Sequence, residues 1–250
     1  MDLSGSTALV TGAASGLGAA TARALADRGV SVLGLDLAAS SSSAGDGDAR
    51  IRYVAADVTD EEQIAAALTQ LESPLRLVVN CAGIAPAVRL LSSKGVHDLA
   101  TFRRTIDVNL VGTFNVLRLA AEVMAANEPL ADGARGLIVN TASVAAYEGQ
   151  IGQVAYAASK GAIVGMTLPA ARDLARYGIR VNTIAPGIVL TPLLTNLGEA
   201  VVDSLSASVP FPARLARPDE YAQLVLMLAD HDYLNGETIR MDGALRMAPQ

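Results

Sequence analysis

The chain has 250 residues and a formal net charge of −6 at pH 7, and 51% of its residues are hydrophobic. This length fits one α/β domain, and the hydrophobic residues come in short runs, whereas a helix that spans a bilayer needs about 20 consecutive apolar residues. The acidic balance and the lack of clustered lysine and arginine in the sequence exclude a nucleic-acid footprint, because affinity for duplex phosphates depends on clustered positive charge. We therefore expect a single domain over residues 1–250 that binds neither nucleic acid nor membrane.

The content of cysteine and histidine limits the possible chemistry further. The sequence contains one cysteine, Cys81, and two histidines, His97 and His231. One cysteine forms no internal disulfide, and so few ligands predict neither a metal site nor a cysteine nucleophile. We expect Cys81 to be a small buried residue and both histidines to lie in solvent. Residues 1–5 are not basic and precede no signal-peptide core, so a cytoplasmic location is expected.

The first predicted elements are a short apolar strand, STALV at 6–10, and a glycine-rich loop, TGAASGLG at 11–18. Gly12 would allow a tight turn, Gly16 would let the backbone approach a pyrophosphate, and Gly18 would let the next helix pack closely on the sheet. The start of that helix provides amide donors and the positive end of its dipole. This strand, loop and helix predict a site for a dinucleotide.

A second apolar run, residues 30–35, ends at Asp36, eighteen residues after Gly18. An acidic residue about 20 positions after such a loop binds the hydroxyls of the adenine ribose. The carboxylate would repel a 2′-phosphate and no arginine follows immediately, so Asp36 favours NAD over NADP. A loop or helix-capping aspartate is the structural alternative. The serine-rich segment 40–43 that follows predicts a surface loop.

Further apolar runs alternate with helical stretches, as in a parallel sheet that is covered on both faces. Ligands bind beyond the carboxyl ends of the strands in such sheets. Three of these runs lead to polar candidates: 51–56 to Asp57, 75–79 to Asn80, and 136–140 to Ser143.

An apolar period near 3.6 residues predicts one long helix over 101–126, with Asn109 near its middle. Asparagine is disfavoured inside helices and is costly to bury without a partner, so a hydrogen-bonding partner is expected. From the residues alone, a bond to nearby backbone that bends the helix remains possible.

Tyr156 and Lys160 are four residues apart, and Ser143 lies thirteen residues before Tyr156. Residues four apart share one face of a helix, here one that begins near Val154. A cation held near a phenol favours the phenolate, so Lys160 is expected to lower the pKa of Tyr156 from about 10. Tyr156 could then act as a general base. The same pair also occurs as solvated residues on amphipathic helices.

Together these motifs resemble the short-chain dehydrogenase/reductase family over nearly the whole chain. The residues that carry the resemblance are TGAASGLG at 11–18, NCAG at 80–83, Asn109, Ser143, Tyr156, Lys160 and PG at 186–187. Longer segments resemble the type II 3-hydroxyacyl-CoA dehydrogenases, also called type 10 17β-hydroxysteroid dehydrogenases: NCAGIA at 80–85, GTFNV at 112–116, NTASVAA at 140–146 and VPFPA at 209–213. Cys81 departs from the broad family, whose commoner motif has a second asparagine there.

The resemblance implies a Rossmann-type doubly wound parallel sheet and an NAD-dependent interconversion of a secondary alcohol and a ketone. The catalytic residues that it implies are Asn109, Ser143, Tyr156 and Lys160, with Asn109 linked to Lys160 through a water as a proton relay, and Ser143 and Tyr156 in contact with the substrate. The cofactor-binding residues that it implies are Gly12, Ser15, Gly16, Leu17, Gly18, Asp36, Leu37, Asp57, Val58, Asn80, Cys81, Ala82, Gly83, Tyr156, Lys160, Pro186, Gly187, Val189 and Thr191.

The resemblance ranks a short or branched 3-hydroxyacyl-CoA first as substrate and a hydroxysteroid second. A 3-oxoacyl-carrier-protein reductase and a non-catalytic NAD-binding scaffold are the alternatives. The apolar, loop-breaking segments within 188–214 suit a mobile lid over an acyl chain or a steroid. Arg89, Lys94, Arg214 and Arg217 are candidates for binding coenzyme A, with ordinary surface charge as the alternative. A homotetramer is also implied, with the helices at 101–126 and 156–176 at one interface and residues 235–250 at another.

Overall fold

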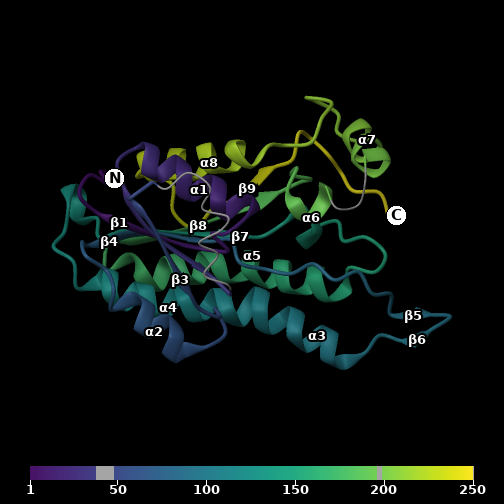
Figure 1. Cartoon of the computed structure of the whole chain (residues 1–250), viewed down its shortest axis with the longest axis horizontal. Coiled ribbons are helices and arrows are strands. Elements are labelled where there is room, and N and C mark those ends of the chain that lie inside the picture. The colour runs from purple at the N-terminus through teal and green to yellow at the C-terminus, as the bar shows by residue number, and fades with distance from the viewer. Residues whose placement is uncertain (38–47, 196–198, 250) are drawn as a thin grey trace.

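The computed structural model describes residues 1–37, 48–195 and 199–249. Seven strands form one parallel sheet in the order β3-β2-β1-β4-β7-β8-β9. Helices cover both faces of this sheet, with α1 and α8 on one face and α2, α4 and α5 on the other (Figure 1). The predicted single-domain, doubly wound α/β fold is confirmed. The loop predicted at 40–43 lies outside the described residues.

The central strands are buried along their whole length, as expected for a parallel sheet between two helical layers. The strands of the sheet are β1 Thr7–Thr11, β2 Ser31–Asp36, β3 Ile51–Ala55, β4 Leu75–Asn80, β7 Gly136–Thr141, β8 Ile179–Pro186 and β9 Thr238–Met241. A separate antiparallel hairpin, which the sequence did not predict, is formed by β5 Leu91–Ser92 and β6 Gly95–Val96. It projects away from the sheet in Figure 1.

The helices form two large hydrophobic cores with the sheet between them, because successive side chains on a strand point to opposite faces. On β1, Leu9 packs in the core under α2 and α4, and Val10 packs in the core under α1 and α8. The helices are α1 Gly16–Asp27, α2 Glu61–Leu68, α3 Leu99–Ile106, α4 Gly112–Ala125, α5 Val154–Ala175, α6 Pro192–Thr195, α7 Glu199–Ala207 and α8 Pro218–Asp230. Short 3-10 turns occur at η2 Ala131–Gly133 and η3 Val144–Ala146.

The long helix predicted over 101–126 is continuous from Leu99 to Ala125, but it is not a regular α-helix. Its middle, η1 Asp107–Val111, is a π-helix, and Asn109 lies within it. Such bulges are rare and are frequent at functional sites. By length and composition the whole helical run could cross a membrane, contrary to the expectation of short runs only, yet half of its most apolar window is buried within the protein. A core helix passes the same test, and this one packs on β4 and α5.

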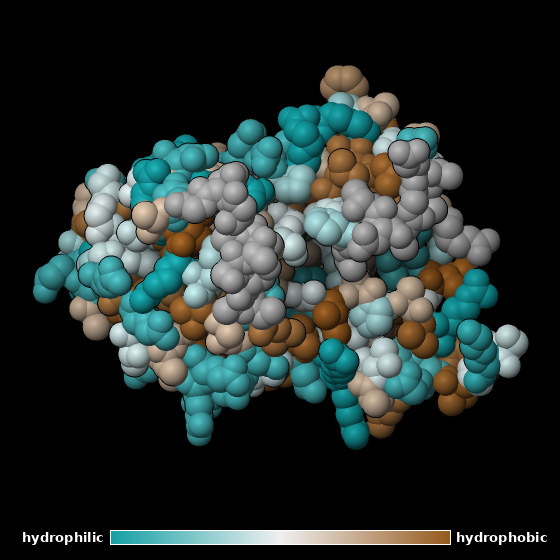
Figure 2. All heavy atoms as spheres, viewed as in Figure 1, coloured by the Kyte–Doolittle hydropathy of each residue, from teal (hydrophilic) through white to brown (hydrophobic). Residues whose placement is uncertain are grey.

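The predicted exposure of the two histidines and burial of the cysteine are confirmed only in part. His231 is exposed as predicted. His97 is half-buried because its ring packs edge-on against Phe102 and its Nδ1 lies 2.7 Å from the carbonyl of Asp98. Cys81 is half-buried, with its thiol in contact with a fully buried tyrosine, Tyr221. On the face shown in Figure 2, hydrophobic residues occur in small groups between hydrophilic ones.

Candidate active site

The glycine-rich loop between β1 and α1 brings three segments of backbone very close together. Gly12 has a φ of +65°, and a Cβ there would lie 2.9 Å from the amide nitrogen of Ala82. A Cβ at Gly18 would lie 2.2 Å from the carbonyl oxygen of Gly12. Gly16, at φ +53°, faces the side chain of Thr191, to which a Cβ would come within 3.3 Å. Larger side chains would therefore separate the loop from β4 and from the segment before α6.

The acidic residues at the ends of β2 and β3 are held in defined orientations. The two carboxylate oxygens of Asp36 accept hydrogen bonds from the amides of Ala14 at 3.0 Å and Leu37 at 2.8 Å. Asp57 accepts from the amide and the hydroxyl of Thr59, at 2.9 and 2.7 Å. Each carboxylate oxygen has two lone pairs, so Asp36 can accept further bonds from a ligand in the cleft.

The segment that follows β4 is fixed by Thr11, a residue to which the sequence analysis gave no role of its own. The hydroxyl oxygen of Thr11 accepts hydrogen bonds from the amides of Cys81 and Ala82, both at 3.1 Å. The side chain of Asn80, a residue predicted to bind the cofactor, is buried, and its Nδ2 donates to Oδ1 of Asn140 at 2.9 Å. Asn80 is the last residue of β4 and is only 3% exposed, and among the described residues it does not line the cleft.

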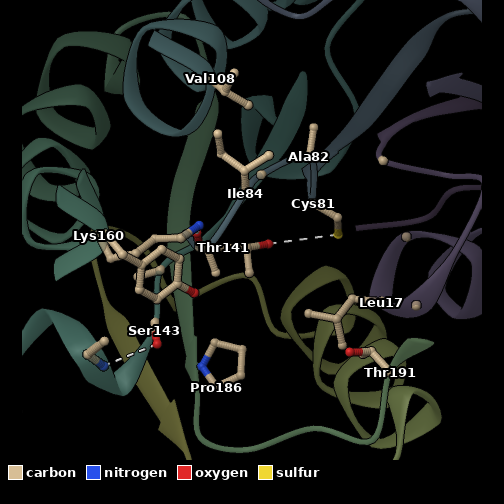
Figure 3. Close-up of a pocket in the computed structure, with 18 of the residues that line it drawn as sticks. Leu17, Cys81, Ala82, Ile84, Val108, Thr141, Ser143, Lys160, Pro186 and Thr191 are labelled. Atoms are coloured by element: carbon tan, nitrogen blue, oxygen red, sulfur yellow. Dashed lines mark hydrogen bonds between the residues drawn. The ribbon is translucent and has the colours of Figure 1, made fainter. Parts of the chain in front are cut away.

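Ser143, Tyr156 and Lys160 meet at one wall, as their spacing predicted. Ser143 follows β7, and Tyr156 and Lys160 lie on α5, which begins at Val154 as expected. The amine of Lys160 donates to the carbonyl of Thr141 at 2.7 Å and lies 5.8 Å from the centre of the Tyr156 ring. Figure 3 shows Lys160 and Thr141 together above Ser143, whose hydroxyl accepts from the amide of Ala145 at 3.1 Å.

Burial dominates the protonation of this group. It raises the pKa of Tyr156, and a hydrogen bond with Ser143 opposes this rise. It also lowers the pKa of Lys160 to about 8. The predicted lowering of the Tyr156 pKa is therefore wrong for the protein without cofactor. Burial of the phenolate raises the pKa by more than the neighbouring groups lower it.

Asn109 has partners that the sequence could not identify. Its Oδ1 accepts from the amide of Ile84 at 2.8 Å, and its Nδ2 donates to the carbonyl of Ile84 at 2.9 Å and to the hydroxyl of Ser159 at 3.0 Å. The side-chain bond to local backbone that was left open is wrong, since Ile84 is distant in the chain. A Cβ at Gly83 would lie 3.1 Å from Asn109 Oδ1 and 3.7 Å from Lys160 Nζ, so this glycine brings the two side chains to one place.

These segments enclose a cleft of about 980 Å³ along the carboxyl ends of the strands. It is lined by Ser143 and by every residue predicted to bind the cofactor except Asn80. Asn109 lies behind the wall and, within the described ranges, does not line the cleft.

The positively charged residues at the cleft differ from those predicted. Among the described residues, Arg103 and Arg104 of α3 line it, and Arg89, Lys94, Arg214 and Arg217 do not. The guanidinium of Arg214 pairs with both carboxylate oxygens of Glu220, at 2.7 and 2.8 Å, and Arg217 lies 3.7 Å from the same carboxylate. Two consecutive arginines near the beginning of the long helical run Leu99–Ala125, in the last turn of α3, were the available sequence signal for Arg103 and Arg104.

The described residues of the segment predicted as a lid, 188–214, include α6 and α7, and several of them line the cleft. Val189 forms an isolated bridge with Ala216, and Leu194 of α6 and Leu205 of α7 line the cleft. Gln150, Gln153 and Met247 also line it, although the sequence analysis did not select them. They follow no motif, and Met247 reaches the cleft from near the other end of the chain.

Comparisons with known proteins agree with this site. The sequence model of the short chain dehydrogenase family matches residues 6–201. The 3-hydroxyacyl-CoA dehydrogenase type-2 of Drosophila melanogaster is 54% identical over 248 residues, which are 96% of this chain and 97% of that protein. The protein of the same name from Rattus norvegicus is 52% identical over 255 residues, with 98% and 97% covered.

A crystal structure of 3-hydroxyacyl-CoA dehydrogenase type-2 from Mycobacterium avium matches with a TM-score of 0.94 and 44% identity, over 98% of both chains. A family match over most of the chain and relatives at this identity, together with Ser143, Tyr156 and Lys160 in one cleft, identify the chemistry. The chain belongs to the short-chain dehydrogenase family, and it is an oxidoreductase that acts on CH–OH groups with a nicotinamide cofactor.

Proposed function

We propose that this chain is an NAD-dependent dehydrogenase that interconverts a 3-hydroxyacyl-CoA and a 3-oxoacyl-CoA. The observation that carries the proposal is the arrangement of one continuous cleft, with Asp36 at one end and Ser143, Tyr156 and Lys160 further along it. The names of the relatives that match nearly the full chain support the substrate class.

The choice of NAD follows from the carboxylate of Asp36. Its oxygens are held by the amides of Ala14 and Leu37 and can accept further hydrogen bonds from ribose hydroxyls. A 2′-phosphate at the same place would bring negative charge against this carboxylate. The close backbone approaches at Gly12, Gly16 and Gly18 fit a pyrophosphate at the start of α1.

The chemistry of the cleft divides between the cofactor and the side chains. When bound, the oxidised nicotinamide ring would accept a hydride from the carbinol carbon. Tyr156 takes the hydroxyl proton as the C–O bond becomes a carbonyl, and Ser143 donates a hydrogen bond to the same oxygen. Because burial raises the pKa of Tyr156, its basic form depends on positive charge in the cleft, and the amine of Lys160 lies 5.8 Å from the centre of its ring. In this proposal Lys160 also binds a ribose hydroxyl of the cofactor.

A relay through Asn109 completes this scheme. Asn109 and Lys160 flank Gly83, and the bonds of Asn109 to Ile84 and Ser159 hold its carboxamide rigidly. A water between the two side chains would carry the proton from Lys160 toward solvent.

We further propose that the protein is a homotetramer, since Phe114 of α4 is 49% exposed and Leu168 of α5 is 43% exposed on helices that could pack against a second chain. A cytoplasmic location, as expected from the sequence, is part of the same proposal.

The test compares the rates at which the protein oxidises 3-hydroxybutyryl-CoA and a hydroxysteroid, each with NAD⁺ and with NADP⁺. The formation of reduced cofactor measures each rate. The expected result is the highest kcat/KM for the acyl-CoA with NAD⁺. Tyr156→Phe should lower kcat by roughly 10²–10⁴-fold and leave NADH binding measurable, because only the proton acceptor is removed. Preference for NADPH and an acyl-carrier-protein substrate would refute the proposal.

A further inference from the structure

The C-terminal segment 245–249 folds back over the loop that connects Ser143 to Tyr156. The side-chain Nε2 of Gln150 donates to the carbonyl of Ala248 at 3.0 Å, and the backbone amide of Ile151 donates to the carbonyl of Pro249 at 2.9 Å. Gln150 and Ile151 lie between Ser143 and Tyr156 in the chain. The C-terminal segment therefore packs against the loop between Ser143 and Tyr156, and Met247 lines the same cleft as they do.

A network of charges fixes this position. The carboxylate of Glu148 accepts from the guanidinium of Arg240 at 2.9 and 3.2 Å and from the amide of Met247 at 3.1 Å. Arg240 also lies 2.7 Å from Asp242 and donates to the carbonyl of Leu245 at 3.2 Å. Residues 245–249 belong to no helix or strand, so these charged hydrogen bonds hold them in place. They thereby fix the position of Met247.

Met247 lines the cleft together with Ser143 and Tyr156. It follows β9, the last strand at one edge of the sheet, whereas Asp36 ends β2 near the opposite edge. Leu205 of α7 lines the cleft as well, and both side chains are half-buried. A thioether on three rotatable bonds is apolar and adaptable, which suits contact with hydrocarbon.

We infer that Met247 forms the end wall of the acyl pocket and sets the length of acyl chain that the enzyme accepts. This inference rests on the proposed 3-hydroxyacyl-CoA substrate. It assigns a specificity role to the C-terminal segment, which lies beyond the residues 6–201 matched by the family model. Glu148 acts as the positioning residue, because its carboxylate holds the backbone of Met247.

The physical basis is the volume that Met247 occupies. Shortening it to alanine would open space into which further methylene groups of a substrate could be buried. Enlarging it to phenylalanine would fill that space and exclude them. One methylene in an apolar pocket changes kcat/KM by about 10-fold or more.

The experiment measures kcat/KM with NAD⁺ for 3-hydroxybutyryl-CoA and for 3-hydroxyoctanoyl-CoA in three proteins: wild type, Met247→Ala and Met247→Phe. The ratio of the long to the short substrate should rise by about 10-fold in Met247→Ala and fall by a similar factor in Met247→Phe. Opposite changes in the two variants would not arise from a general loss of stability, which would lower both rates together.

The control is Met227→Ala, a methionine on α8 that is 38% exposed and lies outside the cleft, and it should leave the ratio unchanged. If both Met247 variants change the two rates by one common factor, Met247 does not contact the acyl chain and the inference fails. A wild-type enzyme that oxidises neither acyl-CoA would instead overturn the proposed function, and the inference with it.

Discussion

Asp36 is the side chain on which the proposed choice of NAD depends. Its carboxylate is oriented by two backbone amides, so its negative charge has one fixed place in the cleft. Hydrogen bonds to a charged group contribute about 1.5–3 kcal/mol. At the residue scale, the proposed selectivity for NAD therefore depends on this charge and not on the shape of the side chain.

Asp36→Asn should lower the ratio of kcat/KM for NAD⁺ to that for NADP⁺ by about 10–100-fold. Asparagine keeps the size of the side chain but removes the charge that repels a 2′-phosphate. Steady-state kinetics with both cofactors measures the ratio. Asp173→Asn, at an exposed position on α5, is the matched control. An unchanged ratio in Asp36→Asn would show that selectivity comes from elsewhere.

Lys160 makes stability depend on pH, because burial lowers its pKa from 10.5 to about 8. Below about pH 8 the amine is charged in the folded and unfolded states, and its burial costs stability in full. Between about pH 8 and its ordinary pKa of 10.5, the unfolded chain binds more protons than the folded protein, so this contribution rises with pH. The rise approaches about 3 kcal/mol at 1.4 kcal/mol per pKa unit.

Lys160→Met should remove this rise. Urea unfolding at about pH 7 and about pH 10, without added cofactor, gives the difference in the free energy of unfolding between wild type and variant. That difference should shift by roughly 2–3 kcal/mol in favour of the wild type between the two pH values. Equal pH dependence in the two proteins would mean that the amine keeps its ordinary pKa.

At the scale of elements, α8 is attached to the cleft by Tyr221. This side chain is fully buried, and its hydroxyl lies 2.7 Å from that of Thr141 and 3.7 Å from the thiol of Cys81. Thr141 also donates to the carbonyl of Asn80 at 2.6 Å, and its own carbonyl accepts from Lys160. One polar cluster therefore connects α8, β4, β7 and α5 beneath the site.

Tyr221→Phe should lower the free energy of unfolding by about 1 kcal/mol, because it removes one buried hydroxyl while keeping the ring. Thr141 retains its bond to Asn80, so no polar partner of Tyr221 loses all its bonds. Urea denaturation measures the change. Tyr233→Phe, at a residue that is 97% exposed, should have no effect. A loss of similar size in both variants would argue against the cluster.

At the scale of the whole molecule, the cleft collects residues from nearly the full length of the chain. The glycine loop, the segment after β4, the start of α5, the lid and the C-terminal segment each form part of it. The N-terminal amine also bonds to the carbonyl of Ala229 at 2.6 Å and to Asp232 at 2.9 Å, which ties the first residues to the end of α8. Folding of the whole domain is thus required to form the site.

The proposed homotetramer gives the prediction at this scale. Phe114→Glu places a charge on the exposed face of α4 and should convert the tetramer to smaller species, because an unpaired charge is costly inside an interface. Light scattering measures the mass. Leu91→Glu, on the projecting hairpin and 72% exposed, should leave the mass of four chains unchanged. A wild-type monomer would refute the assembly.

The sequence by itself determined the alternation of elements, the glycine loop, Asp36, and the group of Ser143, Tyr156 and Lys160. These features depend on neighbours in the chain: a period of two or 3.6 residues, a fixed offset along a helix, or a strand end that precedes a polar residue. Most of the predicted cofactor-binding residues came instead from the family resemblance, and all of them except Asn80 line the cleft.

Only the tertiary structure decided the rest. It buried the side chain of Asn80, gave Asn109 the partners Ile84 and Ser159, and put Arg103 and Arg104, not Arg214 and Arg217, at the cleft. It also reversed the expected pKa of Tyr156 and brought Met247 to the cleft. Burial and contacts between distant segments arise from packing in three dimensions. Local sequence patterns do not specify which distant side chains will line the same cleft.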